Sequence, residues 1–154
     1  MIRLKRTNSD DTDFKNLVVL LDQDLKIRDG EDHGFYNQFN TINTIKHVIV
    51  FYENDIAVGC GAFREKENDT VEIKRMFVHP DYRKKRIAST LLAALETWAA
   101  EINYKYTILE TGKKQPEAIN LYQKQGYQRI PNYPPYETMD NSVCMKKDLI
   151  IQSK

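Results

Sequence analysis

Four consecutive cationic side chains stand immediately before a predicted helix. They are Arg83, Lys84, Lys85 and Arg86, and the helical spacing of apolar residues begins at Ile87. The first turn of a helix offers free backbone N–H groups and the positive end of the helix dipole, so fixed cations there favour an anion such as a phosphorylated ligand. A short charge run can equally be a solvated surface, and charge alone does not decide between the two.

This basic run joins a predicted strand to a predicted helix. Residues 71–78 (VEIKRMFV) are rich in β-branched and aromatic side chains, as strands are, and Pro80 then breaks the strand. From Ile87 onward the apolar residues recur at helical spacing. The pattern predicts that Ser89, Glu96, Thr97 and Glu101 face outward.

The remaining segments alternate between strand-like and helix-like patterns. Strands are predicted over residues 2–6, 47–52, 56–64, 104–110, 127–131 and 142–149. Helices are predicted after the cap-forming Thr7-Asn8-Ser9-Asp10, around residues 35–39, and over residues 117–125 between Pro116 and Gly126. This order indicates a mixed sheet covered by helices, an α/β fold, in a single domain of residues 1–154.

Two short features leave alternatives open. Residues 53–55 read as a three-residue-like hairpin connection. Gly59 and Gly61 lie inside the strand that follows, where they mark either a close approach of another backbone or a ligand, or a bulge. Cys60 and Cys144 lie in strand-like apolar settings and are expected to be buried free thiols rather than a disulfide, a metal site or a nucleophile.

Composition narrows the class of protein. A net charge of +1 gives no general attraction to nucleic acid or membranes, and no apolar run approaches the ~20 residues that span a bilayer. The N-terminus lacks the apolar middle of a secretory signal, so we expect a cytoplasmic protein. His33, His47 and His79 have no metal-ligand spacing, so no metal is predicted.

The basic run is part of a longer motif. Residues 80–88 (PDYRKKRIA) resemble the acyl-CoA signature of the GNAT superfamily of N-acetyltransferases, Arg/Gln-x-x-Gly-x-Gly/Ala, with Arg83 in the first position and Ala88 in the last. Arg86 departs from the pattern, because the family has glycine there. Glycine lets the backbone approach a pyrophosphate without a Cβ in the way. Arg86 fits only if its side chain projects away or itself meets a phosphate, so the affinity for CoA is in question.

A second stretch carries the same resemblance. Residues 109–130 resemble the second GNAT signature, a strand followed by a helix with the pattern Ala-x-x-Leu/Phe-Tyr-x-x-x-Gly-Phe/Tyr, filled here by Ala118, Leu121, Tyr122, Gly126 and Tyr127. Gln115 stands where many members have Asn. Residues 136–149 resemble the ending of a bacterial subset, so the likeness runs from about residue 2 to residue 149.

The resemblance implies a fold and a reaction. The fold is a mixed, mostly antiparallel sheet of about seven strands flanked by about four helices, and the reaction is acetyl transfer from acetyl-CoA to an amine in a ternary complex. Backbone groups at Met76, Phe77 and Val78 are implied to bind the pantetheine arm and polarise the thioester, with Gln115 as a further contact. The residues implied to hold the phosphates are Arg83, Lys84, Lys85, Arg86, Ile87, Ala88 and Ser89.

Three side chains are candidates for proton transfer. Tyr122 matches the tyrosine that protonates the departing thiolate in many relatives, although a core tyrosine would look the same. Glu72 matches a catalytic glutamate of several members, and Glu110 is the second candidate for the base. Water can serve instead, and each glutamate can also be a sheet-edge charge paired with Lys74, Arg75 or Lys105.

The acceptor is the open part of this prediction. It is expected between residues 31–43 and the loop of residues 131–136, where Tyr36, Phe39, Tyr133 and Tyr136 line a pocket and Glu31, Asp32 or Asp140 meets a cationic amine. Peptide N-termini, lysine side chains, polyamines, amino acids and aminoglycosides all remain candidates. Arg86 favours an alternative, a non-catalytic acyl-CoA-binding or sensor protein. Flanking acids argue against a nucleic-acid site, and a homodimer through sheet edges or C-terminal strands stays an option.

Overall fold

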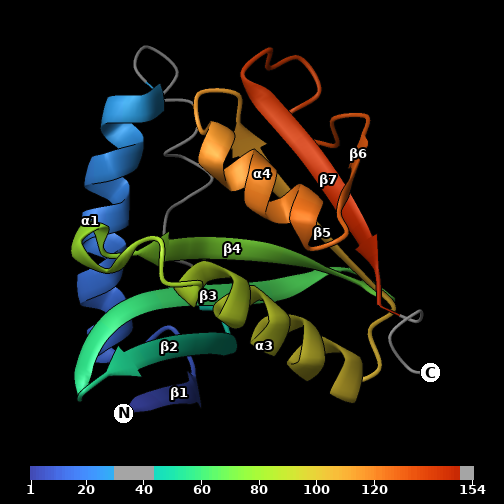
Figure 1. The fold of residues 1–154 in the computed structure, drawn as a ribbon. Coiled ribbons are helices and arrows are strands. Elements are labelled where there is room, and N and C mark those ends of the chain that lie inside the picture. The colour runs from blue at the N-terminus through green and yellow to red at the C-terminus, as the bar shows by residue number, and fades with distance from the viewer. Residues whose placement is uncertain (30–43, 150–154) are drawn as a thin grey trace. The chain divides into compact units, whose positions relative to one another are not determined.

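The computed structural model describes residues 1–29 and 44–149, and its elements follow the predicted order (Figure 1). They are β1 (Ile2–Thr7), α1 (Thr12–Asp29), β2 (His47–Glu53), β3 (Ile56–Glu67), β4 (Thr70–Val78), the 3-10 helix η2 (Pro80–Tyr82), α3 (Ile87–Glu101), β5 (Tyr106–Gly112), α4 (Pro116–Lys124), β6 (Gln128–Ile130) and β7 (Ser142–Asp148). Seven strands form one sheet in the order β1-β2-β3-β4-β5-β7-β6. β4 and β5 pair in parallel, whereas β1–β2, β2–β3, β5–β7 and β6–β7 pair antiparallel. The predicted mixed sheet of about seven strands is confirmed.

About four helices were expected over the whole chain. Within the described residues there are three α-helices, α1, α3 and α4. The short helix predicted around residues 35–39 lies outside the described residues. In terms of contacts the chain divides into two compact units: Met1–Arg64 with Lys74–Leu95, and Glu65–Ile73 with Glu96–Lys154.

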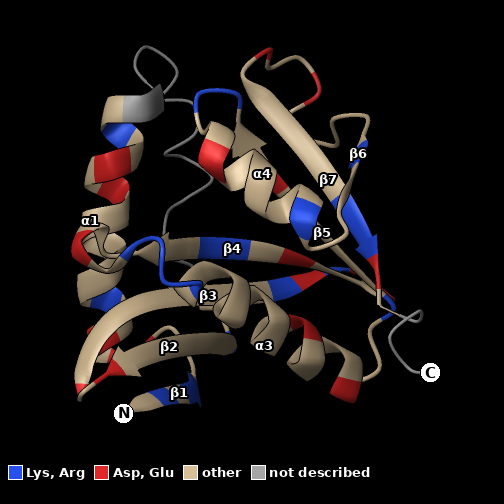
Figure 2. Cartoon of the chain, in the orientation of Figure 1, with Lys and Arg blue, Asp and Glu red and all other residues tan. Residues whose placement is uncertain are grey.

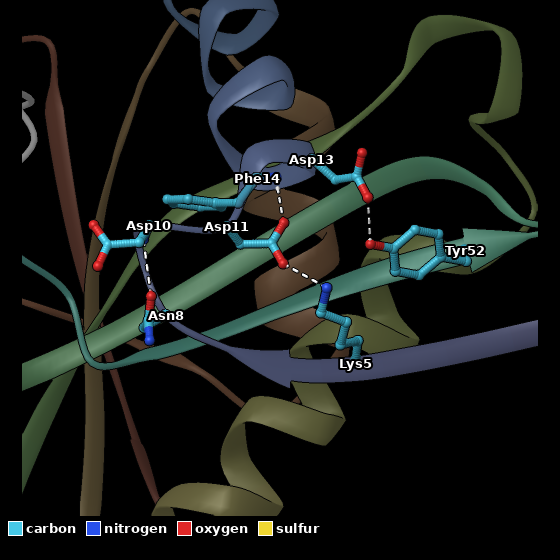
Figure 3. A network of polar contacts seen from close by, with 7 residues as sticks. All are labelled: Lys5, Asn8, Asp10, Asp11, Asp13, Phe14 and Tyr52. Atoms are coloured by element: carbon cyan, nitrogen blue, oxygen red, sulfur yellow. Dashed lines mark hydrogen bonds and ion pairs between the residues drawn. The ribbon is translucent and has the colours of Figure 1, made fainter.

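In the first unit, Asp11 directly precedes α1 and caps it (Figure 3). Its Oδ1 accepts a hydrogen bond of 3.0 Å from the backbone N–H of Phe14, and its Oδ2 lies 2.7 Å from Nζ of Lys5. One carboxylate therefore caps the helix and ties it to β1. The prediction placed the cap at residues 7–10. Within that stretch, Asn8 instead turns the chain, because its Oδ1 accepts from the N–H of Asp10 at 2.9 Å.

Both faces of the sheet are covered in this unit. One face packs against the apolar stripe of α1, and the buried residues that meet there include Phe14, Leu17, Val18, Leu21, Val48, Val50, Cys60, Ala62 and Phe77. The two glycines of β3 face the other way. A Cβ on Gly61 would lie 2.8 Å from Cδ1 of Leu95, and one on Gly59 would lie 3.1 Å from Cδ1 of Leu91. The glycines therefore admit side chains of α3, and at Gly59 a backbone also approaches closely, because an added Cβ would lie 3.2 Å from the carbonyl oxygen of Phe77. The β2–β3 pairing also shifts register next to Gly59, between Phe51 and Tyr52.

Turn geometry moves several predicted boundaries. β2 and β3 are joined by two residues, Asn54 and Asp55, with φ of 50° and 67°, and Glu53 pairs with Ile56. This is the left-handed pair of a type I′ turn, so the three-residue-like connection is wrong. β3 continues to Glu67, beyond the predicted residue 64. β5 starts at Tyr106 rather than at residue 104. Just before the strand, the N–H groups of Lys105 and Tyr106 both donate to the carbonyl oxygen of Asp69, at 2.8 and 3.1 Å.

In the second unit, Glu96 is buried, against the prediction that it faces outward. It is 2% exposed. Its Oε1 lies 2.8 Å from Nζ of Lys147, and its Oε2 accepts a hydrogen bond of 2.9 Å from the hydroxyl of Tyr127, which also contacts Oγ1 of Thr107 at 2.7 Å. The outward assignment fails because these partners from β7, β5 and the start of β6 cover that side of the helix end.

Two smaller predictions are confirmed. Gly126 follows α4 with φ of 98°, a left-handed conformation that suits the residue after a helix. Cys60 and Cys144 are free and buried. Burial raises the pKa of Cys60 to about 12 and that of Cys144 to about 11, so both stay thiols at neutral pH. Their expected role as inert core residues agrees with this.

Candidate active site

The basic run forms a loop between η2 and α3, drawn in blue in Figure 2. We call residues 83–86 the basic loop. Its backbone alternates between ordinary and left-handed conformations, with φ of 68° at Lys84 and 63° at Arg86. At its start, Nε of Arg83 donates to the carbonyl oxygen of Val78 at 2.9 Å, which ties the loop to the end of β4. Alternating conformations of this kind turn successive N–H groups toward one side and favour anions.

The start of α3 leaves its backbone donors exposed to a ligand. In the described part of the chain, no backbone carbonyl accepts from the N–H groups of residues 84–89. The carbonyl oxygen of Arg86 is by contrast heavily used. It accepts from the N–H of Thr90 at 3.1 Å, from Oγ1 of Thr90 at 2.8 Å and from Oγ of Ser89 at 3.0 Å. The N–H groups of residues 84–89 are therefore available as donors to a ligand, whereas the carbonyl oxygen of Arg86 already accepts three hydrogen bonds.

Two of the four cations face acids of the same unit. Nη2 of Arg83 lies 4.0 Å from Oδ2 of Asp24 on α1, and Nζ of Lys85 lies 3.8 Å from Oε2 of Glu53 on β2. These exposed, long contacts contribute little to stability. They leave the Lys85 ammonium able to turn toward a phosphate, whereas the Arg83 guanidinium stays anchored through Nε and offers its terminal nitrogens.

The backbone of Arg86 is left-handed. Glycine, which the family has at this position, adopts that conformation without strain. A left-handed residue with a Cβ costs roughly 1–2 kcal/mol. We predict that Arg86→Gly raises the free energy of unfolding by roughly 0.5–1 kcal/mol, because glycine relieves this strain and gives back part of the gain as unfolded-state entropy. Urea denaturation measures the change.

Lys85→Gly is the matched control for that prediction. It removes a neighbouring cation, but Lys85 lies outside the left-handed region, so glycine there is expected to lower stability by a few tenths to 1 kcal/mol. If Arg86→Gly and Lys85→Gly lower the free energy of unfolding equally, the left-handed conformation of Arg86 does not cost stability.

The end of β4 precedes this loop and holds the segment expected to bind the pantetheine arm. Phe77 and Val78 are buried, and Met76 packs over Gly61, where an added Cβ would clash with its sulfur. Just before them, Arg75 has φ of 60°, and its guanidinium pairs with Asp22 at 3.1 Å. Arg75 is therefore not the partner of a candidate base.

Pairing of β4 with β5 is short. It covers three residue pairs, from Thr70–Tyr106 to Glu72–Ile108, whereas β4 runs on to Val78 and β5 to Gly112. The candidate base Glu72 thus occupies the last paired position. The pairing with β5 therefore ends before Met76, Phe77 and Val78, the residues expected to bind the pantetheine arm.

The second unit holds the two glutamates. Glu72 is 1% exposed, and its Oε2 accepts a hydrogen bond of 2.9 Å from the hydroxyl of Tyr133. Oε2 of Glu110 accepts one of 2.8 Å from Oγ of Ser142, at the start of β7. Each candidate base therefore has its own hydroxyl donor. Neither donor was identified in the sequence as a partner of a glutamate, because nothing local links residues 61 and 32 positions apart.

Tyr122 lies on α4 in the same unit and is buried. Burial first, and then the charge of Glu110, raises the pKa of its phenol above the ordinary value of 10.0. The ring meets that of Tyr127 edge to face, with centroids 5.8 Å apart. Glu110 and Tyr122 are therefore close enough to influence each other. Gln115 precedes α4 as its N-cap residue and makes no side-chain cap bond.

The residues expected to line an acceptor pocket are only partly described. Tyr36, Phe39, Glu31 and Asp32 lie outside the described residues. Tyr133 and Tyr136 meet edge to face with centroids 5.9 Å apart. A cavity of about 320 Å³ in the same unit is lined by residues that include Lys113, Arg129, Asn132, Glu137, Asp140 and Ser142, but not by Tyr133 or Tyr136. Asp140 thus lines a cavity, and its role toward an amine stays a prediction.

The described residues show no cluster of three or more His, Cys, Asp or Glu side chains able to hold a metal ion. No helix in residues 1–29 or 44–149 is long and apolar enough to cross a membrane.

Known proteins resemble this chain in sequence and in structure. Residues 15–127 match the Acetyltransferase (GNAT) family. An IAA acetyltransferase of Azospirillum brasilense is 36% identical over 102 residues, which are 66% of this chain and 67% of that protein. A candidate acyl-CoA N-acyltransferase of Klebsiella pneumoniae has a crystal structure that superimposes with a TM-score of 0.81 at 28% identity, covering 97% of this chain and 98% of its own.

A GNAT family acetyltransferase of Elizabethkingia anophelis, solved with acetyl-CoA bound, shares the fold with a TM-score of 0.68 at 19% identity, over 96% of this chain and 97% of its own. The seven-stranded mixed sheet is thus the GNAT acyl-CoA N-acyltransferase fold. Together with the matched residues 15–127, this likeness means that the chain belongs to the GNAT family of acetyltransferases.

Proposed function

We propose that this protein transfers an acetyl group from acetyl-CoA to a primary amine in a ternary complex. The observation that supports it most is the start of α3, where the N–H groups of residues 84–89 have no backbone acceptor in the described part of the chain and lie beside the basic loop. Two comparisons support the donor and the reaction class: the E. anophelis relative binds acetyl-CoA, and the A. brasilense relative is an acetyltransferase.

The first unit would bind the donor. N–H groups and side chains of residues 83–89 hold the diphosphate, because a helix N-terminus and fixed cations both stabilise negative charge. Backbone groups of Met76, Phe77 and Val78 hold the pantetheine arm and polarise the thioester carbonyl, since fixed N–H dipoles stabilise a developing oxyanion.

The second unit would move the protons. Glu72, directly or through water, takes the proton of the incoming ammonium, and the freed amine attacks the acetyl carbon. As the new C–N bond forms, the C–S bond breaks, and the Tyr122 hydroxyl gives its proton to the departing thiolate. The proton that the new amide nitrogen then loses returns to the Tyr122 phenolate, directly or through water. Glu110 is the alternative base. Burial of Tyr122, followed by the charge of the Glu110 carboxylate, raises the pKa of the phenol and keeps it protonated.

A second candidate function is an acyl-CoA-binding protein or sensor without turnover. Arg86 favours it, because the family glycine is replaced by a bulky, left-handed residue. A panel of amines with acetyl-CoA, read by thiol release, separates the two functions. The panel contains a peptide N-terminus, lysine, spermidine, an amino acid and an aminoglycoside. Amine-dependent thiol release supports the transferase; acetyl-CoA affinity without release supports the sensor.

A charge placed at the start of α3 tests the diphosphate site. We predict that Ala88→Glu weakens acetyl-CoA binding about tenfold or more, because a carboxylate at this position repels the diphosphate. The fold should tolerate the change, since an acid in the first helical turn favours the helix. Calorimetry with acetyl-CoA measures the dissociation constant.

Ala93→Glu is the control for the diphosphate site, because Ala93 is exposed on the same helix but lies beyond its first turn. Its dissociation constant should equal that of the wild type. If both variants bind acetyl-CoA equally well, the diphosphate does not bind at this end of α3.

A further inference from the structure

Glu72 is a charged group in a position that normally excludes charge. It is 1% exposed and lies on β4, at the last residue pair shared with β5. A buried carboxylate is tolerated only when hydrogen-bond donors replace the water that it has lost. The hydroxyl of Tyr133, 2.9 Å from Oε2, is such a donor.

The loop that carries Tyr133 is braced from within. The side-chain amide of Asn132 lies within donating distance of three carbonyl oxygens, those of Tyr136 at 3.2 Å, Met139 at 3.3 Å and Ser142 at 3.1 Å. The N–H of Tyr136 donates to the carbonyl oxygen of Tyr133 at 2.8 Å. Nζ of Lys66 lies 5.2 Å from the centre of the Tyr133 ring. These contacts fix the loop, so the position of the Tyr133 hydroxyl does not depend on its bond to Glu72 alone.

Other titratable groups surround this pair. Cys144 on β7 feels the charges of both Glu72 and Glu110, and Arg129 on β6 acts on it in the opposite sense. Burial, followed by the charge of Glu72 and the hydrogen bond to it, raises the pKa of Tyr133 well above its usual range. Tyr133 and Cys144 therefore keep their protons near neutral pH.

We propose that Tyr133 is the positioning residue of Glu72, whose hydroxyl orients the buried carboxylate and favours its ionised, proton-accepting form. This inference rests on the proposed function, in which Glu72 is the base. A donor hydrogen bond stabilises the charged state of a carboxylate relative to the neutral one. Without the hydroxyl, Glu72 holds its proton to higher pH, so the reaction needs a higher pH to begin.

The first experiment needs no acceptor. Protein labelled with ¹³C at the glutamate carboxyl carbons is titrated by NMR, with the Glu72 signal assigned by its absence in Glu72→Gln. In Tyr133→Phe the midpoint of the Glu72 signal should lie about one pH unit higher than in the wild type, a change that corresponds to the loss of one hydrogen bond. An unmoved midpoint overturns the proposal.

Tyr104→Phe is the matched control for the titration. Tyr104 also donates its hydroxyl to a glutamate of the second unit, Oε1 of Glu65 at 2.7 Å, but that pair is exposed. The variant removes the same kind of bond and should leave the Glu72 midpoint where it is. Asn132→Ala serves as the second variant if Tyr133→Phe fails to fold, because it releases the brace and should raise the midpoint in the same direction.

Activity then separates this proposal from the proposed function. With acetyl-CoA saturating and the best amine of the panel, the acidic limb of kcat/KM should move to higher pH in Tyr133→Phe, and kcat should fall about tenfold with the acetyl-CoA dissociation constant unchanged. If the NMR midpoint moves while the limb stays, Tyr133 positions Glu72 but Glu72 is not the base. If Ser142→Ala moves the limb and Tyr133→Phe does not, the base is Glu110 rather than Glu72, and the NMR midpoint alone then decides whether Tyr133 positions Glu72.

Discussion

Replacing Glu96 with alanine is expected to lower the free energy of unfolding by about 3–5 kcal/mol. The change leaves the Lys147 ammonium, a side chain only 15% exposed, without its carboxylate at 2.8 Å. It also removes the acceptor of the Tyr127 hydroxyl. Breaking a buried ion pair from one side has this cost because the other charge stays desolvated. Urea denaturation followed by the fluorescence of Trp98, the single tryptophan and a neighbour on α3, measures it.

Glu101→Ala is the control on the same helix, since Glu101 is exposed, and it should change stability by less than about 0.5 kcal/mol. A double replacement tests the origin of the loss. Glu96→Met with Lys147→Met removes both charges and should recover most of the stability lost in Glu96→Met alone. If the single losses simply add, the two side chains are not energetically coupled.

Glu96 also shows where reading the sequence fails. Its position, four residues after Leu92 and three before Ala99, borders the apolar stripe of α3, so helical spacing alone leaves its side undecided. The assignment to solvent relied on its charge. What buries it is Lys147, 51 positions away, together with Tyr127. A partner at that distance leaves no local pattern.

Elements with a strong period were predictable. β2, β4 and α3 were predicted to within a few residues, because their apolar residues repeat at the spacing of a strand or a helix. Element boundaries that are set by turns and helix caps were harder to predict. The cap of α1 falls on Asp11 and the β2–β3 turn on Asn54-Asp55, since several neighbouring polar residues could have served equally well.

The candidate site divides in the same way. Residues that belong to a local motif, from Arg83 to Ser89 and Tyr122, could be named from spacing and family resemblance. The hydroxyl groups that donate hydrogen bonds to the two glutamates could not be named in this way. Tyr133 was expected only to line a pocket, and Ser142 only to begin a strand, because a hydrogen bond between distant segments depends on the fold. The roles of the motif residues remain predictions until variants are measured.

Tyr122→Phe is expected to lower turnover by about 10²–10⁴-fold while leaving acetyl-CoA affinity unchanged. The loss is that of a general acid, because the departing thiolate would no longer receive a proton from the phenol. Burial and Glu110 raise the pKa of Tyr122 above 10.0, so the phenol remains protonated, and able to donate, at every pH below that value. Thiol release measures turnover, and calorimetry with acetyl-CoA measures affinity.

Two further measurements separate this acid role from a merely structural one. Tyr104→Phe, which removes an exposed phenol outside the site, should keep wild-type turnover. The solvent deuterium isotope effect on kcat should fall in Tyr122→Phe, because the proton that moves with C–S cleavage is no longer supplied by the protein. Wild-type turnover in Tyr122→Phe would make Tyr122 a core residue. A turnover loss matched by an equal loss of acetyl-CoA affinity would assign it to binding instead, since only an interaction made in the transition state lowers kcat alone.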